Sequence, residues 1–232
     1  MICLAVLASW VAYADAPMDL QDAVKQGLAT VIAKGQGGHT GKVLLLEVTN
    51  SQRKYVTINV PTGLQFKSVN DREQDLMVTQ GVQLVLGAGA TKKIAVNAMC
   101  IQPSNSSPAV GSAFLVGAMA TDTLLKLAQY IAERNLHDEL GQSAVWTVVR
   151  NEGLENIYGP DAKKLSDLIT FMTGITGMPQ PWYNKEKLPP PPGQVFSTEP
   201  SVLHGVYTFH LEEKGFADLA IYDSTGNNSF TG

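Results

Sequence analysis

Cys100 is the residue of this chain that is best suited to form a covalent bond with a substrate or a partner. It lies in the short apolar run of residues 99–101. A catalytic thiol needs a base within hydrogen-bond reach and a third group that orients the base. His137 is the one histidine near the predicted helical layer. A cysteine hydrolase built on Cys100 and His137 is therefore one hypothesis. A surface histidine at a helix end is the simpler interpretation.

A second block, Gln142-Ser143-Ala144-Val145-Trp146, begins an apolar and aromatic helix. The two blocks resemble the thioester domains of bacterial surface adhesins, which carry an aliphatic-Cys-aliphatic motif and a Thr-Gln-x-Ala-aliphatic-Trp block. In that family an internal Cys–Gln thioester captures host amines covalently. The resemblance covers residues 43–146 and implies that Cys100 and Gln142 are thioester candidates.

The chain departs from the family pattern in two ways. Gly141 stands where the family has Thr. The family takes its thioester glutamine from a later aliphatic-Gln-x-x-aliphatic motif, which neither Gln180 nor Gln194 matches. The plain alternative is a buried core thiol, because free cysteine is among the most buried residue types. Gln142 then caps the helix or bridges it to the strands, and Trp146 fills the core.

Composition excludes several other classes of function. The charged fraction is 16%, below the ~25% of a typical soluble protein, and the net charge is −4. A nucleic-acid partner would require a basic patch, and no Lys/Arg-rich stretch exists. No apolar run approaches the ~20 residues of a membrane span. The four histidines are scattered, so we predict no metal site and no cofactor.

The N-terminus indicates export. Residues 2–13 are apolar and uncharged, and Ala12-Tyr13-Ala14 has the small-x-small pattern of a signal-peptidase site. We therefore expect residues 1–14 to be a signal peptide and the protein to be extracellular or on the cell surface. A positive n-region is missing, so a buried N-terminal strand or helix is the alternative. After cleavage Cys100 would be the one remaining cysteine.

Hydrophobic periodicity predicts a helix, a set of strands and then more helices. Apolar residues at helical spacing predict a helix over residues 19–34, within an N-terminal unit of residues 15–38. Short β-rich runs with glycine turns follow and are typical of an antiparallel β-sandwich. They are residues 43–48, 54–60, 76–79, 82–86 and 93–101. Helices are predicted at residues 121–135, 140–150 and 160–173, which completes a unit of residues 39–187.

Pro189-Pro190-Pro191-Pro192 then forms a tether within residues 188–201. A polyproline II spacer and a proline-rich surface loop are both consistent with it. Residues 202–232 read as two or three short strands, and a hairpin of this size is marginally stable alone. The pattern Phe-x-Leu, Gly, Leu-x-Ile-Tyr-Asp, Gly is similar to the Ig-like C-terminal modules of secreted bacterial proteins. The resemblance implies a partial Ig-like segment whose open edges accept a strand.

The overall expectation is an α+β protein. It comprises an antiparallel β-sandwich with an N-terminal helix and a helical layer, then a Pro-rich tether and C-terminal β-strands. We expect an adhesive or structural protein without enzymatic turnover, which docks through these strands on another copy of itself or on another surface protein. Strand addition that does not close into a ring would build a filament. The residues expected to bind the partner are Val206, Tyr207, Phe209, Leu211, Leu219, Ile221 and Tyr222.

Overall fold

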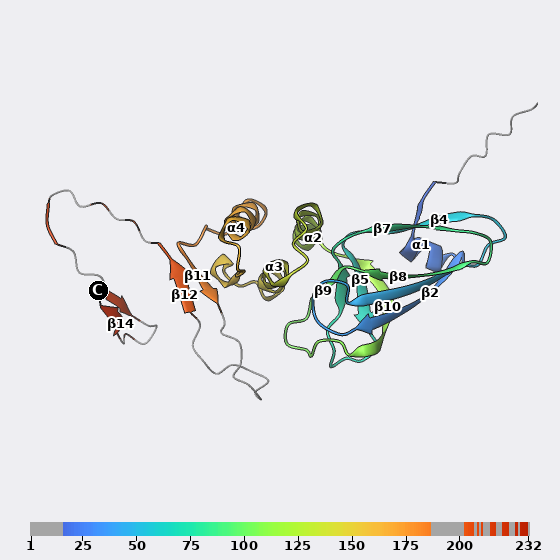
Figure 1. The fold of residues 1–232 in the computed structure, drawn as a ribbon, viewed down its shortest axis with the longest axis horizontal. Coiled ribbons are helices and arrows are strands. Elements are labelled where there is room, and N and C mark those ends of the chain that lie inside the picture. The colour runs from blue at the N-terminus through green and yellow to red at the C-terminus, as the bar shows by residue number, and fades with distance from the viewer. Residues whose placement is uncertain are drawn as a thin grey trace, which may run out of the picture.

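The computed structural model describes residues 16–186 and 202–206, together with residues 208, 210, 214–216, 220–222, 226 and 228–231. In this part of the chain the fold is mixed α+β and consists mostly of β-sheet (Figure 1). We call residues 16–120, which hold the larger sheets, the β body. Residues 121–178, which hold the main helices, are the helical layer.

The largest sheet is antiparallel and has the strand order β8-β3-β2-β10-β5-β6-β9. Its strands are β2 (Ala29–Gln36), β3 (Leu44–Asn50), β5 (Leu64–Ser68), β6 (Leu76–Val78), β8 (Thr91–Val96), β9 (Ala98–Cys100) and β10 (Val110–Met119). A second sheet has the order β1-β4-β7. It contains β1 (Met18–Asp19), β4 (Val56–Val60) and β7 (Val82–Leu86). The short helix α1 (Leu20–Lys25) lies between β1 and β2.

The large sheet is strongly curled. Its two edge strands, β8 and β9, follow each other in sequence with Asn97 alone between them. Two edges joined by one residue must lie close together, because adjacent Cα atoms are 3.8 Å apart. Residues from both sheets and from α1 enclose one apolar core, which includes Leu20, Leu46, Ile58 and Phe66.

Asn50 ties the two sheets together at the end of β3. Its side-chain amide donates to the carbonyl oxygens of Lys54 at 2.8 Å, Gly87 at 2.7 Å and Leu86 at 3.3 Å. Its Oδ1 accepts from the amide of Gln52 at 2.8 Å. The side chain is buried, so one residue satisfies backbone groups on the segments that flank β4 and β7.

The helical layer contains α2 (Asp122–Arg134), α3 (Glu139–Arg150), the 3₁₀ turn η1 (Leu154–Asn156) and α4 (Ala162–Thr176). Asp138 and Asp161 cap α3 and α4 by accepting from backbone amides of their first turns. The helices share a second apolar core with the residues of β6 and β9 that point away from the first, Met77 and Met99. These three helices confirm the predicted helical layer to within a few residues at each end.

The predicted N-terminal helix is wrong beyond Lys25. Gly27 adopts a left-handed conformation that ends α1, and the chain continues as strand β2. In residues 29–33 the apolar side chains fit a period of two as well as a helical period. Pairing with β3 and β10 favours the strand over the helix, since cross-strand packing stabilises β-branched residues.

The predicted β-sandwich is not confirmed. Seven of the strands form one curled sheet, whereas a sandwich would consist of two sheets packed face to face. The expected strand of residues 93–101 is divided at Asn97 into β8 and β9. Besides β2, the large sheet contains two strands that were not predicted, β5 and β10, and the short strands β1 and β11 (Tyr183–Glu186) outside it were not predicted either. Glycines at 111 and 117 hid the strand pattern of β10, although it lies near the middle of the sheet.

The C-terminal strands form two further small sheets. β11 (Tyr183–Glu186) pairs with β12 (Val202–Gly205), and β13 (Ala220–Tyr222) pairs with β14 (Asn228–Thr231). The predicted signal peptide and proline tether lie outside the described residues. Within the described part of the chain, no helix has the length and apolar character needed to cross a membrane.

We expect Asn50→Ala to lower the free energy of unfolding by about 2–4 kcal/mol, because it removes a buried amide that bonds three carbonyl groups at the junction of the two sheets. Urea titration followed by circular dichroism measures the change. Asn59→Ala is the matched control, since Asn59 makes one exposed bond to Asp19 and should cost less than about 1 kcal/mol. Equal losses in the two variants would contradict the role given to Asn50.

Candidate functional site

Cys100 ends the edge strand β9, at the boundary between the β body and the helical layer. Side chains alternate along this strand, so Met99 enters the core of the helical layer and Cys100 enters the core of the β body. The thiol is fully buried, and burial raises its pKa to about 12. Burial in apolar surroundings thus keeps the group protonated, whereas a nucleophilic cysteine needs a lowered pKa.

Gln142, in the first turns of α3, binds the backbone of Cys100 with both ends of its amide. Its Nε2 donates to the Cys100 carbonyl at 2.8 Å, and its Oε1 accepts from the Cys100 amide at 3.0 Å. Both residues have no exposed surface. The side chain therefore pairs with the sheet edge as a neighbouring strand would, and it fixes the helical layer to the β body.

Gly141 makes this contact possible. A Cβ atom at position 141 would collide with the carbonyl oxygen of Leu136 and lie 2.8 Å from Cε of Met99. The departure from the threonine of the adhesin pattern therefore has a steric reason in this chain.

A loop of residues 37–43 covers the rest of the β9 edge. The Cys100 amide also donates to the carbonyl of His39 at 3.1 Å, and the Ala98 amide donates to the carbonyl of Gly41 at 2.8 Å. An open edge would be free to pair with another chain. Here Gln142, His39 and Gly41 bond the amides of Ala98 and Cys100 and the carbonyl of Cys100.

His39 also contacts α3 through its ring. Nε2 lies 2.7 Å from Oε1 of Glu139, and the ring stacks on Trp146 with centroids 5.6 Å apart. The hydrogen bond to Glu139 raises the pKa of His39 and lowers that of Glu139. Sequence reasoning missed both residues. A lone histidine in a glycine-rich loop gives no sequence pattern that predicts a contact. The position of Glu139, directly after the capping Asp138, was a sequence feature that pointed to the start of α3.

His137 does not act as a base for Cys100 in this arrangement. Its Nδ1 lies 3.0 Å from the hydroxyl of Thr79, and burial lowers its pKa. No hydrogen bond between His137 and Cys100 is present among the described residues. The two residues that the hydrolase hypothesis joined are thus engaged with other groups.

The structure brings Cys100 and Gln142 together, but through the backbone N–H and C=O of Cys100. The thiol points to the opposite side of β9, into the core of the β body. Gln180 lies in the described segment after α4, and Gln194 lies outside the described residues.

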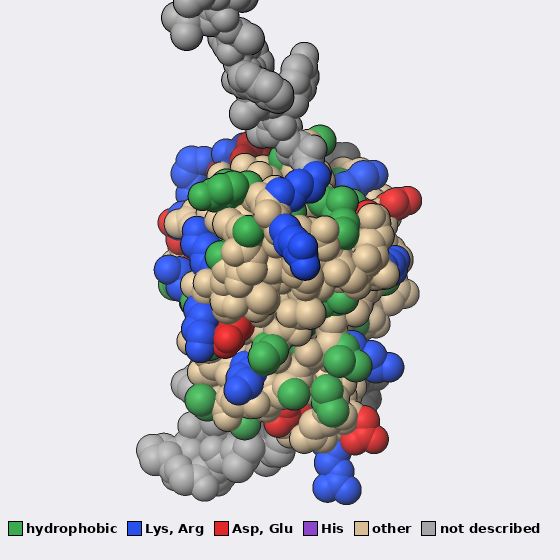
Figure 2. All heavy atoms as spheres, turned by 90° about the vertical axis from the view of Figure 1, so that its right-hand side faces the viewer, with side chains coloured by type: hydrophobic (Ala, Val, Ile, Leu, Met, Phe, Trp, Pro, Cys, Tyr) green, Lys and Arg blue, Asp and Glu red, His purple; other side chains and the backbone are tan. Residues whose placement is uncertain are grey.

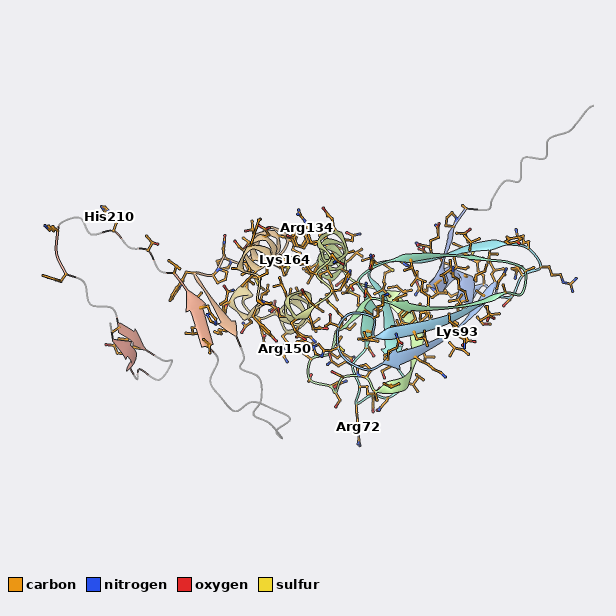
Figure 3. All side chains as sticks on the ribbon, viewed as in Figure 1. Arg72, Lys93, Arg134, Arg150, Lys164 and His210 are labelled. Atoms are coloured by element: carbon orange, nitrogen blue, oxygen red, sulfur yellow. The ribbon has the colours of Figure 1, made fainter. Side chains whose placement is uncertain are left out.

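A cavity of about 140 Å³ opens beside this junction, next to α3. It is lined by Ser143, Trp146, Thr147, Arg150, Glu152, Asn156, Tyr158 and Lys185. Figure 3 labels Arg150 in this region, where it faces the β body and donates to the carbonyl of Pro103 at 3.4 Å. The charged groups of the cavity are already paired: Arg150 with Glu152, and Lys185 with Glu155. No group of three His, Cys, Asp or Glu residues in the described chain could hold a metal ion.

Of the residues predicted to bind a partner, the structure describes the side chains of Val206 and Tyr222. Both are exposed, by 83% and 62%. Ile221 lies in β13, which pairs with β14. Tyr207, Phe209, Leu211 and Leu219 lie outside the described residues.

We expect Gln142→Ala to lower the free energy of unfolding by about 2–4 kcal/mol, because the buried Cys100 carbonyl loses its partner and a cavity remains. Urea unfolding measures the loss. Gln180→Ala, on the segment after α4, is the control and should change stability by less than about 0.5 kcal/mol. If Gln142→Ala and Gln180→Ala unfold with the same free energy, the contact between Gln142 and the Cys100 backbone does not hold the helical layer to the β body.

We expect the native thiol of Cys100 to resist iodoacetamide at pH 8, and to take up one carbamidomethyl group after unfolding, because it is buried and protonated. Mass spectrometry on the chain from Asp15, in which Cys100 is the sole cysteine, reads the result. A mass one ammonia below that of the sequence, restored to reactivity by methylamine, would instead reveal a thioester.

The His39–Glu139 pair should make stability depend on pH. The raised pKa of His39 contributes stability that is full below its ordinary value of 6.5 and is lost as the pH rises through the folded value. The lowered pKa of Glu139 contributes stability that is full above 4.5 and is lost as the pH falls. We therefore expect a coupling of at most about 1 kcal/mol, greatest between pH 4.5 and 6.5, because the pair is partly exposed.

A double-mutant cycle with His39→Gln and Glu139→Gln, unfolded in urea at several pH values, measures this coupling. A coupling that grows as the pH rises above 6.5 would be the opposite of the expected sign. An NMR titration of His39 that gives a pKa below 6.5 would contradict the assignment independently.

Comparison with known proteins adds no relative from which a role could be transferred. No protein-family model matches the chain, and neither the curated proteins nor the solved structures contain a significant match to it.

Proposed function

We propose that this chain is an exported cell-surface or extracellular protein with a structural or adhesive role, which assembles through its C-terminal strands. The body formed by the sheets and helices is the rigid part, and residues 206–232 are the part that docks. The apolar N-terminal segment with its small-x-small site supports export.

The observation that carries the proposal is the exposed apolar surface of the C-terminal segment. Phe216 is fully exposed, and Val206 and Tyr222 expose most of their surfaces. The β13–β14 hairpin has no third strand in the described chain. A two-stranded hairpin is marginally stable in water, so a sheet edge or an apolar face of a partner would stabilise it.

The preceding strand supports the same division of roles. β12 already pairs with β11 of the same chain, and β11 is fixed to the helical layer by a bond from Asn184 to the carbonyl of Ile157 at 3.2 Å. The segment therefore leaves the body from an anchored strand, and we assign the docking to the residues beyond Gly205.

The buried, protonated Cys100 favours a role without turnover over a cysteine hydrolase. A covalent thioester adhesin is the second candidate. The contact between Gln142 and the backbone of Cys100 favours it, because it places the two adhesin-like blocks side by side.

We expect the full chain to form large oligomers or filaments, and a chain that stops after His210 to be monomeric, because truncation removes the hairpin but keeps β12. Light scattering and negative-stain microscopy measure the difference. A full-length Val149→Asp variant, which alters an exposed apolar residue of α3, is the control and should assemble normally. Monomers of the full chain at every concentration would contradict the proposal.

A further inference from the structure

We propose that the outer face of the seven-stranded sheet receives the C-terminal segment, residues 206–232, of a second copy of this chain. The inference rests on the proposed function and deepens it, since it names the surface on which the segment docks. Three features match the C-terminal segment to this face: the charges of both, their exposed apolar side chains and their positions in the molecule.

The outer face is defined by the strand alternation. On β2, β3, β5, β8 and β10 every second side chain points away from the core. The strand registers place these residues side by side: Lys34 lies opposite Leu45 and Ala113, Glu47 lies between Ile32 and Lys93, and Leu115 lies opposite Lys67. The outer face therefore includes Ile32, Lys34, Leu45, Glu47, Lys67, Lys93, Ala113 and Leu115, together with the polar Thr30, Gln36, Thr49, Gln65 and Thr91.

Two large apolar side chains of this face are exposed to solvent. Ile32 is 54% exposed and Leu115 is 63% exposed. The helices do not cover it, because α3 meets the sheet at β9, whereas β2 and β10 extend to the side away from the helical layer (Figure 1). Exposed apolar residues that form a group mark an interaction surface more often than isolated ones do.

The charges of the outer face are positive. Glu47 is paired with Lys93 at 2.9 Å, so Lys34 and Lys67 give this face a net positive charge. Lys and Arg side chains also stand around the neighbouring end of the β body, with smaller areas of Asp and Glu between them (Figure 2). An acidic and apolar partner would match this surface best.

The C-terminal segment has this composition. It contains the carboxylates of Glu212, Glu213, Asp218 and Asp223 against the single Lys214. The same segment carries the exposed Val206, Phe216 and Tyr222. Acidic side chains would meet Lys34 and Lys67, while the aromatic rings would cover Ile32 and Leu115.

The two surfaces lie at opposite ends of the molecule. β14 is at one end of the long axis and β2 and β10 are near the other (Figure 1). His210 and Lys93 mark the same separation in Figure 3. Docking between copies is thus head-to-tail, which builds a filament when the rotation between copies does not close a ring.

Charge-reversed full-length chains test the proposal. One chain carries Lys34→Glu and Lys67→Glu, and the other carries Glu212→Lys and Glu213→Lys. We expect each variant alone to associate at least about tenfold more weakly than wild type, and an equimolar mixture to recover assembly, because each reversed face then meets a reversed segment. Lys126→Glu with Lys164→Glu on the helical layer is the matched control, and thermal unfolding checks that every variant is folded.

Light scattering over a range of salt concentrations reads the result, since screening weakens such contacts. Recovery in the mixture, with normal assembly of the control, supports the proposal. If the Lys34 and Lys67 variant assembles as well as wild type, or if the mixture does not recover, the outer face is not the docking surface, while the proposed function stands. If wild type does not assemble at all, both fail.

Discussion

The buried amide of Gln142 is the interaction on which the arrangement of the molecule depends. The helical layer and the β body have separate apolar cores. Strand β9 lies between them and contributes side chains to both. At this strand a helix side chain replaces the neighbouring strand that an edge would otherwise need, and it bonds both backbone polar groups of one residue, the N–H and the C=O of Cys100. A glycine at 141 and a loop carbonyl at His39 complete the junction. The same contact engages the Cys100 backbone and leaves the thiol in the opposite core.

The curl of the large sheet is the second constraint, and it shapes the surface that a partner could use. Asn97 alone connects the two edge strands, so the sheet must curl, and its concave side packs on the apolar core of the β body. Its convex side then faces solvent over β2, β3 and β10. Hydrogen bonds to Ala98 and Cys100 occupy the β9 edge that meets the helices, so this edge does not offer these groups to another chain.

Local patterns predicted the helices and many of the strands, because capping aspartates, glycine stops and apolar stripes act over a few residues. In α4, Asp161 caps the first turn and Gly177 ends the helix in a left-handed conformation, within a few residues of the predicted range 160–173. The patterns failed where long-range pairing decides the structure. Residues 29–36 became a strand between β3 and β10, and β10 itself was hidden by its glycines. At the site, Cys100 and Gln142 were named from the sequence as thioester candidates, a role that stays a prediction. His39 and Glu139 were not found from the sequence, since contacts between a loop and a helix about 100 residues apart leave no periodic trace.

Hydrogen exchange at the Cys100 amide tests most directly whether Gln142 holds the helices and the β body together as one unit. This amide belongs to the last residue of an edge strand, where fast local opening would be the ordinary behaviour. If the junction acts as described, it should exchange only through global unfolding, with the same denaturant dependence as the amide of Leu46 in the buried strand β3. Fast exchange that is insensitive to denaturant would show that the edge opens locally and that the account of a single rigid body is wrong.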